Sequence, residues 1–142
     1  MHRIQKGAVR VAVLIVVFIV LIALVVWIVS AFQKAYQDGQ RQEKAEAQAQ
    51  LLEPTIKIFR SATGRMPWSL LDRFPDGQSF ASTLPDSNCL PNAFTGHRTE
   101  PHFFDRIYKK AGKGTIAIVS EYNRDYLVVY GRQETVCYKI SF

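Results

Sequence analysis

The chain has 142 residues, which allows one soluble domain of ordinary size beside a membrane segment. Of its 18 basic residues, three precede a long apolar run. The remainder therefore has 15 basic and 12 acidic residues, a net charge of +3. This near balance excludes the broad basic surface of a nucleic-acid-binding protein.

The first predicted element is a transmembrane helix at residues 11–32. This run reads VAVLIVVFIVLIALVVWIVSAF, and Ser30 is its only polar side chain. A helix of this length spans roughly 33 Å, enough for a hydrocarbon core of about 30 Å. A buried core helix is rarely apolar all round over such a length. A cleaved signal peptide has an apolar region of only about 7–15 residues, although Val29-Ser30-Ala31 resembles a cleavage site.

The flanking charges predict the orientation of this anchor. Arg3, Lys6 and Arg10 precede the span without any acid, whereas basic and acidic residues alternate after it. Because basic residues collect on the cytoplasmic side, we expect residues 1–10 to be cytoplasmic and the C-terminal part to be periplasmic. The expected location is the bacterial inner membrane, crossed once.

Small and aromatic residues mark the surfaces of the anchor. The alanines allow close contact with a neighbouring helix, and the aromatic rings favour the outer head-group layer. The anchor contains no His and no ionisable group, so it offers no usual axial ligand for a haem and no proton path. The alternative is plain anchoring in the lipid bilayer. The expected packing residues are Ala12, Ala23, Trp27, Ala31, Phe32 and Tyr36.

Residues 33–50 are rich in Gln, Ala, Glu and Lys, which predicts a helical stalk. From residue 51 onward, apolar residues recur every three to four positions through Ala62, so this face should pack on a soluble domain. Pro54 lacks an amide donor and should kink the helix or begin a new one. Thr63-Gly64 supplies its C-terminal stop.

The remainder, residues 51–142, predicts a periplasmic α+β domain. A turn and short helix at residues 66–71 should lead into a long ordered loop at 75–101, followed by a short helix or irregular edge at 103–108. Three runs rich in β-branched and aromatic residues then predict strands. Their short connections predict a three-stranded antiparallel meander with the helix on one face. These strands are expected at residues 115–120, 126–130 and 135–140.

The cysteines of the chain are Cys89 and Cys137, whose spacing matches no metal motif. An oxidising compartment would let them pair, and closing a loop of about 49 residues would contribute about 4 kcal/mol in the chain-entropy model. We expect this disulfide; two buried free thiols are the alternative.

The sequence offers little catalytic chemistry, so no catalytic residue and no cofactor is expected. There is no Gly-rich phosphate loop, no haem-attachment motif and no nucleophile beside a base. His97, Glu100 and His102 are the metal-ligand candidates, although two His and one carboxylate on a loop occur often by chance. A basic cluster has two interpretations, a solvated loop face or contact with anionic head groups or an acidic partner. Its members are Arg106, Lys109, Lys110 and Lys113.

Two motifs follow the long helix. The first comprises Thr63, Gly64, Met66, Pro67 and Leu70-Leu71, and the second is Leu90 to Gly96 (LPNAFTG). With the order of elements, these motifs resemble the bacterial type IV pilins and the pseudopilins of type II secretion. The long helix of that family commonly ends in a threonine-glycine-aromatic-proline turn followed by leucine. A leucine-proline-asparagine-proline-aromatic-threonine-glycine segment often precedes its first strand, and Ala93 stands here in place of the second proline.

The N-terminus departs from that family. Prepilins are cut after a glycine, and a glutamate normally lies five residues beyond the cut. Lys6-Gly7 resembles the start of such a site, but the fifth residue after Gly7 is Ala12, and Arg10 occupies the third position. In the family the glutamate is thought to pair with a neighbouring subunit's N-terminus, so its absence argues against self-assembly into a pilus.

Three functional hypotheses follow. The first is a non-enzymatic, pilin-like structural subunit of a larger integral-membrane complex, with photosynthetic and respiratory complexes as candidates. Its domain would dock on the periplasmic surface of partner subunits. The second is a divergent minor pilin or pseudopilin of a pilus, secretion or DNA-uptake machine. The third is a periplasmic binding or metal-dependent domain.

Overall fold

The computed structural model describes residues 2–84 and 90–142. It has an α+β fold, as expected, in which a single long helix, α1 (His2–Thr63), precedes all the strands. The chain divides into two compact units, Met1–Gln37 and Asp38–Phe142. From His2 onward the first unit belongs to α1. Within the described residues, the second combines the remainder of α1 with the short 3-10 helix η1 (Phe80–Thr83) and six strands.

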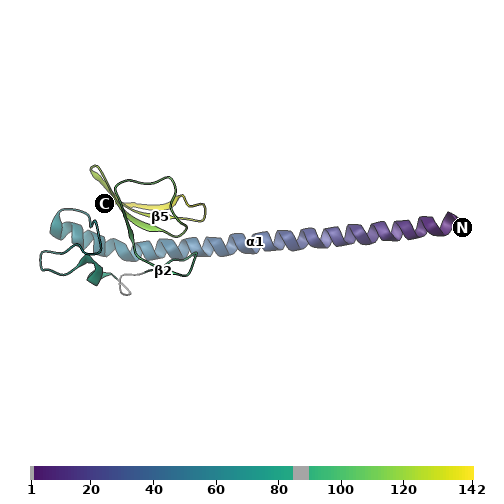
Figure 1. Ribbon diagram of the computed structural model, residues 1–142, viewed down its shortest axis with the longest axis horizontal. Coiled ribbons are helices and arrows are strands. Elements are labelled where there is room, and N and C mark those ends of the chain that lie inside the picture. The colour runs from purple at the N-terminus through teal and green to yellow at the C-terminus, as the bar shows by residue number, and fades with distance from the viewer. Residues whose placement is uncertain (1, 85–89) are drawn as a thin grey trace. The chain divides into compact units, whose positions relative to one another are not determined.

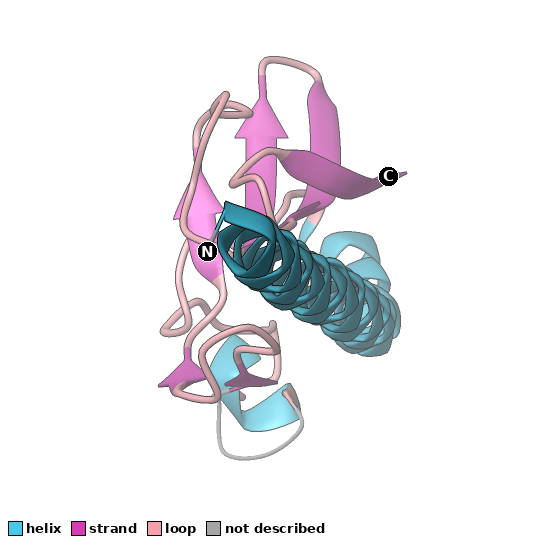
Figure 2. Cartoon of the chain, turned by 90° about the vertical axis from the view of Figure 1, so that its right-hand side faces the viewer, coloured by secondary structure: helices cyan, strands magenta, loops and turns pink. Residues whose placement is uncertain are grey.

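The larger sheet of the second unit has four strands in the order β3-β4-β5-β6. β4 pairs antiparallel with β5, and β5 with β6, whereas β3 pairs parallel with β4. A separate antiparallel pair, β1 (Leu90–Pro91) and β2 (Arg98–Thr99), lies on a different side of α1 from the larger sheet (Figures 1 and 2). The strands of the larger sheet are β3 (His102–Phe104), β4 (Ile116–Glu121), β5 (Arg124–Tyr130) and β6 (Val136–Ser141).

The main core lies between α1 and one face of the larger sheet. Along α1, the fully buried residues follow a spacing of three to four positions, which places them on one side of the helix. They pack against alternate residues of β4 and β5, because successive side chains of a strand point to opposite faces. The helix contributes Ala45, Ala49, Leu52, Ile56 and Phe59, and the strands contribute Ile116, Ile118, Leu127 and Val129.

The opposite face of the sheet is covered by the connection between β3 and β4. Ile107 and Ala111 from this connection pack on a second cluster that includes Val128 and Tyr130. The Tyr130 hydroxyl accepts a hydrogen bond from the Tyr108 amide (3.1 Å) and donates one to the Tyr108 carbonyl (3.0 Å). Burial raises the pKa of Tyr130, which keeps the hydroxyl protonated for this pair of bonds.

The sheet differs from the expected three-stranded meander because β3 adds a fourth, parallel strand. The sequence indicated a short helix or irregular edge at residues 103–108, but residues 102–104 form an edge strand. A parallel neighbour needs a crossover of about a dozen residues, and residues 105–115 supply it. The other predicted strands differ from β4, β5 and β6 by at most two residues at either end.

The helix also differs from its prediction. α1 continues through Pro54 without a new start. Pro54 and Gln50 are both exposed, so water can satisfy the Gln50 carbonyl that the missing amide leaves unpaired. Residues 33–50 were expected to form a stalk, yet the second unit begins at Asp38 and Ala45 is fully buried. Alanine side chains let the sheet approach α1 closely. Because this segment has few large apolar residues, its sequence lacks the pattern typical of a helix that packs in a core.

The turn after α1 contains no helix at residues 66–71. The Trp68 amide instead donates to the Asp72 carboxylate (2.6 Å), which holds the chain in an open turn. Within the loop expected at 75–101, the structure places η1, whose Ser79 cap accepts from the Ser82 amide (3.2 Å), and the β1–β2 pair.

Two isoleucines of α1 test this packing. Ile56 is 0% exposed and Ile58 is 62% exposed. Truncation of Ile56 to alanine removes buried methyl groups and leaves a cavity, so we expect a loss of about 2–5 kcal/mol in the free energy of unfolding. Ile58→Ala should change it by about 0.5 kcal/mol or less. Urea unfolding of the full chain in detergent, followed by circular dichroism, measures both; equal losses would contradict the packing.

Candidate functional site

The most extensive candidate site is the apolar surface of the first unit. Every described side chain from Val9 to Phe32 is exposed. Among the described residues, α1 is the one helix that is long and apolar enough near the N-terminus to cross a membrane. Membrane anchors and signal sequences both have such a helix. Exposed apolar side chains over so many turns are unstable in water and need an apolar environment.

The six expected packing residues all lie on this helix and are exposed: Ala12, Ala23, Trp27, Ala31, Phe32 and Tyr36. Ala12 and Ala23 lie about three turns apart on one face, because an α-helix has 3.6 residues per turn. Phe32 and Tyr36, four residues apart, share another face. Trp27 follows Ala23 by four residues and therefore lies on the side of the alanines, so small and aromatic residues are not fully segregated around the helix.

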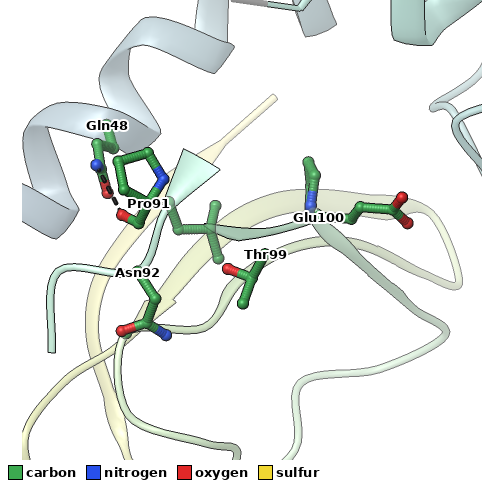
Figure 3. Close-up of a pocket in the computed structure, with 8 residues that line it drawn as sticks. Gln48, Pro91, Asn92, Thr99 and Glu100 are labelled. Carbon is green, nitrogen blue, oxygen red and sulfur yellow. Dashed lines mark hydrogen bonds between the residues drawn. The ribbon is translucent and has the colours of Figure 1, made fainter. Parts of the chain in front are cut away.

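A second candidate is the segment that contains LPNAFTG, shown in Figure 3. Here Gln48 of α1 donates to the Pro91 carbonyl (2.9 Å). Asn92 is almost fully buried and makes three side-chain hydrogen bonds: it donates to the Lys113 carbonyl (2.7 Å) and accepts from the amides of Phe94 (2.9 Å) and Thr95 (3.1 Å). This one side chain ties its own turn to the loop before β4.

The cavity between these residues has a volume of about 10 Å³, room for roughly one water molecule. Gly114 adjoins it with a φ of +72°, and a Cβ at that position would lie 2.4 Å from the Asn92 Oδ1 atom. The LPNAFTG segment therefore links α1, its own turn and the loop before β4, and we call it the latch. Its cavity is too small for an organic ligand.

Replacing Asn92 tests the latch. Asn92→Ala leaves the Lys113 carbonyl and two amides without their partners, so we expect a loss of about 2–3 kcal/mol in the free energy of unfolding. Asn123→Ala, in the exposed β4–β5 turn, is the matched control and should change it by about 0.5 kcal/mol or less. The role of Asn92 would be refuted by a variant as stable as the control in urea.

The three weak metal-ligand candidates are not arranged as a metal site in the described structure. His97 precedes β2, Glu100 follows it and His102 begins β3, and all three are exposed. Within residues 2–84 and 90–142, no group of three or more His, Cys, Asp or Glu side chains is arranged to hold a metal ion. Closeness in sequence does not bring these side chains together, because the chain passes through β2 and turns between them.

The expected disulfide involves Cys89, which lies outside the described residues. Its expected partner, Cys137 in β6, is half-buried and directs its Sγ atom to the Val129 carbonyl (3.4 Å). Burial raises the pKa of the Cys137 thiol, with a further contribution from the charge of Glu46. The disulfide stays a prediction.

A third candidate is an aromatic pocket of about 400 Å³ beside the C-terminal ends of β3 and β4. Among its lining residues, Trp68 is 68% exposed and Tyr122 is 100% exposed. Asp105 and Ser120 are its polar side chains. The lining residues are Pro67, Trp68, Phe103, Phe104, Asp105, Ile118, Ser120 and Tyr122.

Trp68 is exposed but held in place. Its amide is bonded to Asp72, and the Arg65 guanidinium lies 5.4 Å from its ring centroid while pairing with the same carboxylate (2.9 Å). Burial alone would raise the pKa of Asp72, but hydrogen bonds from Arg65, Trp68 and Ser69 and the Arg65 charge lower it. The ionised carboxylate therefore orders both the turn and the indole.

Tyr122 occupies the first position of the two-residue turn between β4 and β5, with a φ of +53°. A non-glycine residue in this region costs about 1–3 kcal/mol. Glycine or asparagine would relieve the strain, so the tyrosine ring at the tip points to a role outside the packing of the domain. Trp68, Tyr122 and Asp72 were not predicted as site residues. A tyrosine in a tight turn between two strands could have indicated Tyr122.

The Asp72 network should make stability depend on pH. Because its pKa is lower in the folded chain, ionised Asp72 stabilises the fold above its unfolded pKa of about 3.9, and this stabilisation is lost as the pH falls through the lower folded value. We therefore expect Asp72→Asn to be less stable than the wild type at pH 7, with the difference shrinking below about pH 4. Urea unfolding midpoints of both proteins at pH 7 and below about pH 4 measure this difference. A difference that is the same at the two pH values would contradict the stabilising role of ionised Asp72.

Comparisons of the chain with protein-family models, with curated proteins and with solved structures found no match. The structure itself offers three features that bear on function: the exposed apolar helix, the latch and the aromatic pocket.

Proposed function

We propose that this chain is a non-enzymatic, membrane-anchored structural subunit of a larger integral-membrane complex. The observation that carries the proposal is the apolar surface of α1, exposed at every described position from Val9 to Phe32. Lipid and neighbouring transmembrane helices are the environments that satisfy such a surface. In this proposal residues 1–10 are cytoplasmic and the second unit is periplasmic, as the positive-inside rule favours.

The aromatic pocket is the proposed docking surface for a partner subunit. Binding energy at protein interfaces concentrates in rigid aromatic anchors, with tryptophan and tyrosine enriched. Trp68 has these properties, since the Arg65–Asp72 pair and the Asp72–amide bond fix it before any partner arrives. A preordered anchor loses little side-chain entropy on binding. Tyr122 extends the same surface at an energetic cost to the isolated domain.

We further propose that the second unit is pilin-like in its packing. The support is the order of elements, with α1 laid on β4, β5 and β6. The latch also falls on the LPNAFTG segment that resembles the family. The second candidate function, a divergent minor pilin or pseudopilin, shares this support. The missing glutamate at Ala12 favours the structural subunit.

The intact mass of the native protein separates these two candidates. A structural subunit with an unprocessed anchor keeps its first seven residues. Removal of residues 1–7 with N-methylation of Ala8 would instead identify a processed pilin. Both products retain residues 11–32, so the measured mass distinguishes only whether the N-terminus is processed.

Docking is tested by gentle detergent extraction and identification of the proteins that co-purify. We expect the wild-type chain to retain stoichiometric membrane partners and Trp68→Ala to lose them by about tenfold or more, the size of a hot-spot truncation. Leu71→Ala is the matched control, because Leu71 is 82% exposed in the same turn but does not line the pocket. A wild-type chain that runs as a monomer would refute the proposal. Equal retention by both variants would refute the pocket as the docking site.

A further inference from the structure

The connection between β3 and β4 carries a group of basic side chains that the core does not use. Ile107 and Ala111 turn inward to cover the sheet, whereas Lys109, Lys110 and Lys113 are exposed. We call these three residues the lysine loop. The alternation leaves one surface of the connection apolar and buried and the other surface positively charged.

The lysine loop has no neutralising partner among the described side chains. Arg106, the other basic residue of the connection, lies 3.9 Å from Asp105 and stacks over the Tyr108 ring. By contrast, none of the three lysines lies within ion-pair distance of a described carboxylate. The nearby Asp38 carboxylate is already neutralised by Arg132 (2.9 Å) and Arg41 (3.5 Å).

Backbone contacts place the lysine loop at one end of the second unit. The Ala111 amide donates to the Glu134 carbonyl (2.9 Å), and the Gly114 amide to the Tyr130 carbonyl (2.7 Å). Arg132, from the same β5–β6 turn, pairs with Asp38. The loop therefore belongs to the end at which α1 enters the unit, since Asp38 is its first residue.

Chain connectivity limits how far this end can lie from the apolar run. Asp38 follows Phe32 by six residues, which span no more than about 22 Å even when fully extended. A tether this short gives the lysine loop a high effective concentration at the surface in which the apolar run ends. Even weak electrostatic contacts become populated under these conditions.

We infer that Lys109, Lys110 and Lys113 bind the anionic head groups of the lipid leaflet in which the apolar helix ends. Clustered lysines beside a membrane segment are attracted to acidic lipids, and the attraction decays within a Debye length of about 8 Å at physiological salt. The contact would restrain the domain against the bilayer beside its partners. This inference rests on the membrane anchor of the proposed function.

Amine-reactive labelling of the full chain tests the inference. The protein is placed in nanodiscs of phosphatidylcholine alone or of phosphatidylcholine mixed with phosphatidylglycerol, and modification of each lysine is read by mass spectrometry. We expect labelling of the lysine loop to fall roughly threefold in the anionic discs and to recover at about 0.5 M salt. Lys57, paired with Glu53 (2.6 Å), and Lys139, over the Tyr126 ring, are internal controls that should be unchanged.

Each other outcome overturns a specific step. Equal labelling in the two kinds of disc, or protection that survives high salt, refutes the lipid contact. Protection in native membranes but not in anionic discs also refutes it and assigns the lysine loop to an acidic protein. A chain that does not enter the discs refutes the anchor instead, so failure of the inference is distinguishable from failure of the proposed function.

Discussion

The packing of one stripe of α1 against the larger sheet is the interaction on which the second unit depends. Leu52, Ile56 and Phe59 fill the space above β4 and β5, while Ala45 and Ala49 let the two layers approach closely. The remaining elements attach to this pair of layers. Phe74 and Phe80 pack edge-on against Phe59 (4.9 and 5.4 Å between ring centroids), which fixes the chain that follows the helix. The Trp68 turn lies between Phe59 and Phe74, and Gln48 of α1 bonds the latch at Pro91, so both are positioned by the helix.

The sequence predicted the elements that carry strong local signals. The apolar run, the helix and the three hairpin-connected strands have clear periodicity or β-branched composition, and their local preferences agree with the fold. β3 was missed because a strand of three residues gains its stability from pairing with β4, a contact that no local pattern encodes. Of the two alternatives predicted for Pro54, the start of a new helix was wrong, because packing on both sides of the proline outweighs the cost of one absent hydrogen bond.

The functional surfaces were predictable to different degrees. The long apolar helix follows from composition alone, and the basic residues of the β3–β4 connection are visible in the sequence. Their position at the same end of the second unit as Asp38 is not, because only the contacts of the β5–β6 turn with Ala111 and with Asp38 reveal it. The aromatic pocket joins residues that are about fifty positions apart, from Trp68 to Tyr122, so only the fold reveals it. His97, Glu100 and His102 are close along the chain and were weak metal-ligand candidates, but within the described residues they belong to no group able to hold a metal ion.

α1 therefore combines a buried stripe that packs on the sheet with an exposed apolar run, which we propose is a membrane anchor. Alkaline carbonate extraction of membranes, followed by the mass of the protein recovered, tests this claim most directly. We expect the chain to stay in the membrane pellet with residues 11–32 intact, because an apolar helix in the hydrocarbon core resists extraction. A soluble product that begins after Ala31 would show instead that the helix is a cleaved signal sequence and would contradict the proposed anchor.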